Sequence, residues 1–191
     1  MRPRYQAIDM GVSAGGFKAL STVLPCFDRD FPLPVFIVQH LSPSSDSYFV
    51  DHLQSLCSVQ VKMAEDKELA RRGVVYLAPP DYHLLIETDY TLALSLENRV
   101  NYSRPSIDVL FASAAEVYLG GLIGVVMTGA NNDGAIGLQR IKECGGLTVV
   151  QAPGTAEVDV MPLAAIDAVP VDHIITLARL GDFLNMTAMG H

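Results

Sequence analysis

The sequence has no tryptophan, few cysteines and fewer basic than acidic residues. Its three cysteines, Cys26, Cys57 and Cys144, are widely spaced and form no Cys-x-x-Cys pair. The spacing therefore predicts neither a zinc site nor a disulfide framework. We expect free thiols and a reducing, cytoplasmic location.

Positive charge is also scarce, with 13 Lys and Arg against 21 Asp and Glu, a net charge of −8. Such an excess of negative charge disfavours nucleic acid and anionic membrane surfaces as partners. No apolar stretch approaches the roughly 20 residues that span a bilayer, so we expect no direct membrane insertion. No His-Glu-x-x-His or comparable cluster is present, and no metal site is predicted.

The 191 residues are half hydrophobic and fit one domain, 1–191. Strand-like runs alternate with helical segments along most of the chain. We expect strands at 5–10, 35–39, 122–127, 147–151 and 173–175, and helices at 16–24, 47–56, 106–118, 134–144, 162–168 and 177–184. This alternation predicts an α/β fold with a doubly wound, mostly parallel sheet and helices on both faces.

The middle of the chain has a different pattern. Short strand-like runs at 59–64, 74–78, 83–87 and 91–96 are separated by turn signals such as Pro79-Pro80-Asp81. This pattern is typical of antiparallel hairpins. We expect these hairpins to extend one edge of the parallel sheet.

The stretch Gly11-Val12-Ser13-Ala14-Gly15-Gly16 directly follows the first apolar strand. A strand that ends in Gly-x-Ser-x-Gly and opens a helix is typical of a nucleophile elbow, which exposes its serine. The alternatives are a phosphate-binding turn or a plain packing turn. Because a serine stands where the dinucleotide motif needs its second glycine, a nucleotide is disfavoured and no cofactor is predicted.

Two more polar residues follow strands of the predicted sheet. His40 ends the second strand, and Asp133 lies a few residues past the strand at 122–127. Since parallel strands end at one rim, Ser13, His40 and Asp133 are predicted to supply nucleophile, base and orienting acid. His40 and Asp133 also have simpler interpretations. His40 could be a hydrogen-bonded histidine at a strand end, and Asp133 could be an aspartate that caps the following helix.

Three further polar residues have alternative roles. Arg104 lies just before a helix, where it would either contact substrate or remain a solvated loop residue. Ser106 is predicted to be a local helix-start residue rather than a nucleophile. Asp9, inside the first strand, is interpreted as a structural carboxylate.

Several separate motifs occur in an order that resembles one known family. They are Gly11-Val12-Ser13-Ala14-Gly15-Gly16, Val38-Gln39-His40-Leu41, the run at 75–85, Arg104-Pro105-Ser106-Ile107-Asp108-Val109-Leu110-Phe111, Met127-Thr128-Gly129 with Asn132-Asp133-Gly134, and Met161-Pro162. From about residue 8 to 184 the chain resembles the catalytic domain of the chemotaxis protein-glutamate methylesterases, the CheB family.

The resemblance implies a cytoplasmic serine hydrolase of chemotaxis signal transduction that needs no cofactor. The family removes methyl groups from glutamate methyl esters on chemoreceptor helices, and related members deamidate receptor glutamines. Its triad falls on Ser13, His40 and Asp133, with backbone N–H groups near Ala14 or Ala130 as oxyanion donors.

The chain also departs from the family pattern. Family members often carry an N-terminal phosphorelay receiver domain, whereas this sequence starts at the catalytic strand. It is expected to be either a fragment or a stand-alone member, with a receiver domain as a partner in cis or in trans. Some members have threonine where Ala14 stands, and Gly129-Ala130-Asn131 replaces a Gly-Met-Gly run. Two alternatives stay open: a hydrolase of the same fold for another ester or amide, and a catalytically silent signalling module.

Overall fold

The computed structural model describes residues 5–40 and 48–190 and is built around one parallel sheet. The seven strands are ordered β3-β4-β2-β1-β7-β8-β9. Their bounds are β1 Ala7–Val12, β2 Val35–Gln39, β3 Gln60–Met63, β4 Val74–Leu77, β7 Leu122–Val126, β8 Leu147–Gln151 and β9 His173–Ile175. Every neighbouring pair in this sheet is parallel, which confirms the predicted fold class.

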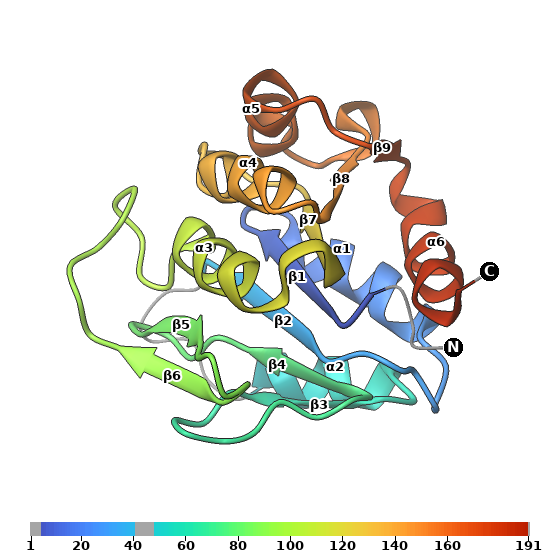
Figure 1. Cartoon of the computed structure of the whole chain (residues 1–191). Coiled ribbons are helices and arrows are strands. Elements are labelled where there is room, and N and C mark those ends of the chain that lie inside the picture. Colours follow the sequence, from blue (N-terminus) through green and yellow to red (C-terminus); the bar gives the residue numbers. More distant parts are fainter. Residues whose placement is uncertain (1–4, 41–47, 191) are drawn as a thin grey trace.

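Helices cover both faces of the sheet (Figure 1). The six α-helices of the described residues are α1 Gly16–Val23, α2 Tyr48–Leu56, α3 Ile107–Tyr118, α4 Ala135–Glu143, α5 Val160–Ala168 and α6 Leu177–Met189. Three short 3-10 helices follow or connect them, at Leu24–Cys26, Leu119–Gly121 and Pro153–Thr155. Residues of α1, α2 and α6 share one hydrophobic cluster, and residues of α3, α4 and α5 share the other.

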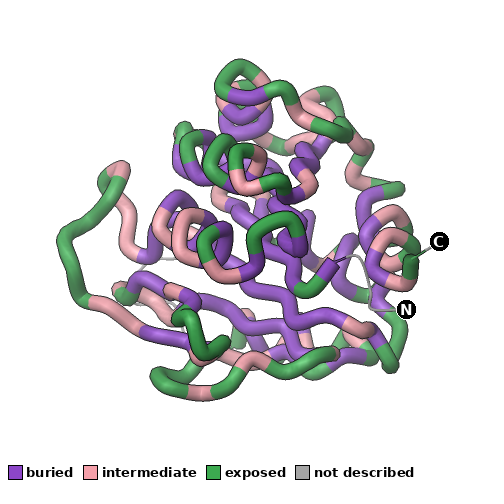
Figure 2. The backbone as a smooth tube through the Cα atoms, in the orientation of Figure 1, coloured by how far each residue is buried: buried purple, intermediate pink, exposed green. Residues whose placement is uncertain are grey.

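The central strands are buried on both faces, as Figure 2 shows for the middle of the molecule. In β1, Ile8, Met10 and Val12 face the cluster of α1, α2 and α6, while Ala7 faces the other cluster. Such continuous apolar strands are typical of a parallel sheet covered by helices on both sides.

The predicted antiparallel pairing of the middle section is correct for one pair of strands and wrong for the other. β3 and β4 are parallel members of the main sheet, with Val61 beside Val75. Among the strands of the described residues, β5 His83–Ile86 and β6 Leu92–Ser95 alone form an antiparallel pair, and they make a separate two-stranded sheet. The prediction failed for β3 and β4 because no helix lies between them, so the usual sign of a parallel crossover is missing.

Element boundaries shift by a few residues from the expected ones. β1 begins at Ala7 and runs to Val12, α5 begins at Val160, and α6 continues to Met189. Leu41, which ends the second family motif, and residue 47 of the helix expected at 47–56 lie outside the described residues. None of the helices in residues 5–40 and 48–190 is long and apolar enough to cross a membrane.

Candidate active site

The serine of the glycine-rich turn lies at the carboxyl end of the central strand β1. Its backbone N–H donates to the Thr128 carbonyl oxygen at 2.9 Å, which ties the turn to the end of β7. Gly15 has a φ of 77°, a left-handed conformation that favours glycine. A β-carbon on Gly16 would collide with the side chain of Gln39. The glycines thus allow the sharp strand-to-helix turn that leaves Ser13 half-buried at the rim.

His40 connects this serine to the predicted aspartate. Its Nδ1 lies 3.2 Å from Ser13 Oγ, and its Nε2 lies 2.8 Å from Asp133 Oδ2. Because an ionised carboxylate only accepts hydrogen bonds, Nε2 carries the proton and Nδ1 is left to accept from the serine hydroxyl. The two ring nitrogens are therefore exchanged relative to the Ser-His-Asp template, in which Nε2 faces the serine.

Asp133 is buried and receives an unusual number of hydrogen bonds. Besides His40, its donors are the Asn101 amide, the Ser106 hydroxyl and the N–H groups of Ile107 and Asp108. Burial alone would raise the pKa of the Asp133 carboxyl, but these hydrogen bonds outweigh burial and hold the pKa below its usual value. Asp133 is thereby kept ionised beside His40.

The amide side chains of Gln39 and Asn131, to which the sequence analysis gave no role, hold the site together. Gln39 Nε2 donates to the carbonyl oxygens of Ser13 at 3.0 Å and His40 at 3.1 Å. Asn131 accepts from the Asp133 N–H through Oδ1, and its Nδ2 lies 3.2 Å from His40 Nδ1. Their signal in the sequence was only their position next to His40 and Asp133.

The predicted oxyanion donors, Ala14 and Ala130, lie on two different loops near Ser13, and their role stays a prediction. Within the described residues, the N–H groups of Ala14 and Ala130 donate no hydrogen bond to the protein, and both residues are exposed. A β-carbon on Gly129 would come within 2.9 Å of Ser13 Cβ, so only glycine lets this loop approach so closely. The approach brings the Ala130 backbone next to the elbow.

The Arg104 guanidinium is hydrogen-bonded within the protein and is not a free, solvated loop side chain. Its Nε and Nη2 donate to Asp81 Oδ1 at 3.2 and 3.0 Å, and its Nη1 donates to the carbonyl oxygens of Leu96 and Glu97. These contacts anchor the loop between β6 and α3. Substrate contact by Arg104 stays a prediction.

Ser106 directly precedes α3, as expected of a helix-start residue, but its side chain caps nothing in that helix. Its hydroxyl donates instead to Asp133 Oδ1 at 2.8 Å. Ser106 is completely buried, so it contributes to the surroundings of the aspartate rather than to the exposed rim.

Asp9 is buried in β1 and behaves differently from Asp133. Neither of its carboxyl oxygens has a hydrogen-bond partner in the described part of the chain. Burial therefore raises its pKa well above the ordinary value. Across residues 5–40 and 48–190, no group of three or more His, Cys, Asp or Glu side chains is arranged to hold a metal ion.

The fold and these contacts define a doubly wound α/β protein with a Ser-His-Asp chain at the carboxyl rim of its sheet. Comparison with known proteins then gives the family. The family model described as CheB methylesterase matches residues 8–184. The chain belongs to the CheB methylesterase family.

Individual relatives agree with this assignment. A protein from Leptospira interrogans is 53% identical over 178 residues, which cover 93% of this chain and 92% of the relative. The protein-glutamate methylesterase/protein-glutamine glutaminase of Clostridium acetobutylicum is 35% identical over 93% of this chain, which spans only 51% of that relative. The solved catalytic domain of the Thermotoga maritima CheB methylesterase superposes with a TM-score of 0.91 at 30% identity, covering 95% of this chain and 97% of that one.

Proposed function

We propose that this chain is a serine hydrolase that removes methyl esters from glutamate side chains of chemoreceptors. The observation that carries the proposal is the hydrogen-bonded chain from Ser13 through His40 to Asp133. Family membership and the names of the relatives support the choice of ester. The proposed catalytic unit is the single domain formed by this chain.

In the proposed reaction, Ser13 Oγ attacks the carbonyl carbon of the glutamyl methyl ester. His40 Nδ1 takes the serine proton as the new carbon–oxygen bond forms, and Asp133 stabilises the imidazolium. The proton then passes to the methoxy oxygen, which leaves as methanol. A water molecule, deprotonated by His40, hydrolyses the acyl-enzyme and releases the glutamate.

The negative charge that develops on the carbonyl oxygen needs donors that are already in place. The N–H groups of Ala14 and Ala130 are proposed for this role because they flank Ser13 and are not used within the described protein. Preorganised N–H donors of this kind are typically worth a factor of about 10² to 10³ in kcat.

The same acyl-enzyme would form from a glutamine side chain, with ammonia as the leaving group in place of methanol. The name of the Clostridium acetobutylicum relative includes protein-glutamine glutaminase, which favours this second activity. A receiver domain acting in cis or in trans is the proposed regulatory partner.

The test is methanol release from a methylated chemoreceptor by the purified chain, with ammonia release from the unmodified receptor measured in parallel. Methanol released by the wild type, and lost when Ser13 is replaced by alanine, is the expected result. Release of neither product by a folded wild-type chain, with hydrolysis of simple esters retained, would favour the alternative of another ester. No hydrolysis of any ester would favour a silent signalling module.

A further inference from the structure

The loop between β6 and α3 projects from the body of the molecule on the side where α3 begins (Figure 1). Residues 96–100 of this loop are all exposed (Figure 2). Its base is nevertheless firmly held. Arg104 fastens it to Asp81, and His83 links the Asn98 carbonyl oxygen, at 3.0 Å from Nε2, to the Ser106 N–H.

The tip of this loop is a two-residue turn. Val100 and Ser103 exchange two backbone hydrogen bonds, of 3.1 and 2.9 Å. The residues between them, Asn101 and Tyr102, have φ values of 51° and 62°. Two successive positive φ angles define a type I′ turn, in which asparagine is favoured first and glycine second. Tyrosine at the second position is therefore strained.

The two central residues of the turn have opposite surroundings. Asn101 Nδ2 donates to Asp133 Oδ1 at 3.0 Å and to Asp108 Oδ2 at 2.7 Å, so it bridges two carboxylates. Asp108 in turn accepts from the N–H groups of Gly134 and Gly137, which fixes the start of α4 directly after Asp133.

Tyr102, by contrast, is 96% exposed and gains nothing from packing that would offset its strained backbone. Strained residues of this kind persist mainly where they serve a function. Exposed tyrosines are also enriched where proteins contact other polypeptides, because the ring offers a large rigid surface and a hydroxyl.

We propose that Asn101 is a positioning residue that orients Asp133 toward His40, and that the same turn presents Tyr102 to the polypeptide flanking the scissile ester. This inference rests on the proposed function. The turn thereby fixes the triad from one side while it engages the substrate from the other. The two halves make different predictions, because one acts on turnover and the other on binding.

Asn101→Gly isolates the amide, since glycine keeps the positive φ of the turn. We expect kcat to fall roughly 10- to 100-fold, the loss typical of one hydrogen bond to a charged group, with KM unchanged. The fall should be equal for a methylated receptor and for a small ester such as p-nitrophenyl acetate. Asn101→Asp, which places a third carboxylate beside Asp108 and Asp133, should be slower still.

A readout without substrate tests the same point. The His40 Nε2 proton, which is bonded to Asp133, is expected to give a downfield NMR signal that shifts or broadens in Asn101→Gly. A signal and a kcat that both stay at the wild-type values would overturn the positioning role. Because this signal needs no turnover, it decides the question even if the proposed ester specificity is wrong.

Tyr102→Gly removes the ring and relieves the backbone strain, so the variant should be at least as stable as the wild type. We expect KM and Kd for the methylated receptor to rise about tenfold or more, with kinetics on p-nitrophenyl acetate unchanged. Kd is measured in a Ser13→Ala background, so that binding is read without turnover.

Tyr90→Gly is the matched control. Tyr90 is also an exposed tyrosine with a positive φ, of 65°, but it contacts Tyr118 at the opposite end of α3 from Asn101. The Tyr90→Gly variant should bind the methylated receptor with the Kd of the wild type. Equal effects of Tyr90→Gly and Tyr102→Gly, or no effect of Tyr102→Gly, would overturn the substrate contact.

Discussion

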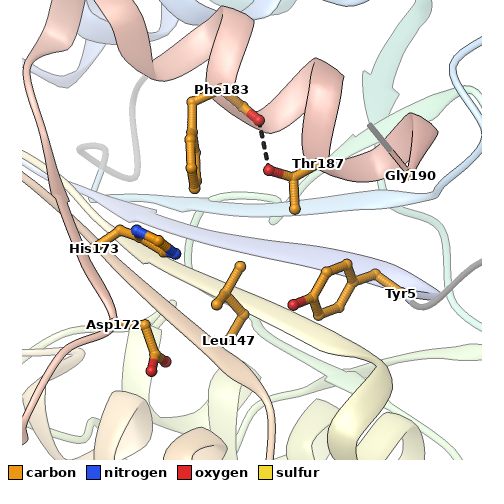
Figure 3. Close-up of a pocket in the computed structure, with 7 residues that line it drawn as sticks. All are labelled: Tyr5, Leu147, Asp172, His173, Phe183, Thr187 and Gly190. Atoms are coloured by element: carbon orange, nitrogen blue, oxygen red, sulfur yellow. Dashed lines mark hydrogen bonds between the residues drawn. The ribbon is translucent and has the colours of Figure 1, made fainter.

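A histidine and an aspartate lie at each end of the parallel sheet, but their hydrogen-bond partners differ between the two ends. At the carboxyl ends of the strands, Ser13, His40 and Asp133 form one chain of hydrogen bonds. At the amino ends, a pocket of about 580 Å³ is lined by an aspartate and a histidine as well, Asp172 and His173 (Figure 3). Residue types alone would therefore not separate the two ends.

The partners of the two aspartates make the difference. Asp172 accepts from the Lys142 ammonium and from the N–H and hydroxyl of Thr148, so in the described structure it joins β8 to the segment before β9. His173 lies against the Phe183 ring, with 4.9 Å between ring centroids. Asp133, in contrast, directs one oxygen at a histidine that itself reaches a half-buried serine. A reactive arrangement requires this continuity.

A third carboxyl group, in the middle of the sheet, extends the comparison. Asp9 and Asp133 are both almost fully buried, yet their pKa values move in opposite directions. Asp133 has five hydrogen-bond donors, while Asp9 has none among the described residues. For these two carboxyl groups, which are about equally buried, the hydrogen-bond donors decide the direction of the pKa shift.

Replacing the serine at the carboxyl end should have the largest effect. Ser13→Ala is expected to lower kcat by about 10⁶-fold, because nucleophile and base act as one unit. The fold should persist, since the side chain lost is small and half-buried. Methanol release and circular dichroism check the two parts, and wild-type turnover in the variant would remove Ser13 from the mechanism.

The two aspartates can be compared directly by one substitution. Asp133→Asn is expected to lower kcat by about 10⁴-fold through the wrong histidine tautomer. Asp172→Asn makes the same chemical change at the other end of the sheet and should leave kcat within about twofold, although its link to Lys142 is weakened. Equal losses in steady-state kinetics would contradict the distinction between the two ends.

The buried carboxyl in β1 should affect stability and its pH dependence. Burial raises the folded-state pKa of Asp9, so below the unfolded-state pKa of about 3.9 Asp9 is protonated in both states and adds no pH-dependent cost. Above that pH the group destabilises the fold increasingly as pH rises toward the folded-state pKa. The difference in free energy of unfolding between Asp9→Asn and the wild type should therefore grow in favour of the variant by about 1.4 kcal/mol per pH unit in that interval. Urea unfolding from pH 4 to 7 measures the gap, and parallel curves would mean that Asp9 is not protonated in the fold.

The smallest effect is expected for the histidine at the amino end. His173→Ala should leave kcat within about twofold and lower the free energy of unfolding by at most about 1 kcal/mol, the value of one aromatic contact. A large loss of turnover with an intact fold would show that the pocket in Figure 3 takes part in the reaction.

Much of this architecture could be predicted from the sequence because it depends on local signals. Buried apolar runs gave β2 and β8 with their observed bounds. The glycine-rich turn after β1 and the polar residues after β2 and β7 predicted that three side chains would meet at one rim. Parallel strands impose that meeting, so no knowledge of distances was needed.

The rest depends on contacts between distant segments. Asn101 looks like an ordinary polar loop residue, and its place beside Asp133 follows only from how the loop folds back on α3 and α4. The exchange of the two His40 nitrogens likewise depends on side-chain orientation. The parallel pairing of β3 and β4 lacked the intervening helix that usually reveals such a crossover.

The most direct test of the triad is covalent labelling of the purified chain with a fluorophosphonate, which reacts with activated serines. Intact mass and peptide mapping should find a single adduct, on Ser13, and labelling should slow strongly in Asp133→Asn but not in Asp172→Asn. An adduct on another serine, or labelling of Ser13 that is equally fast in both variants, would contradict the account of an activated serine at the carboxyl end of the sheet.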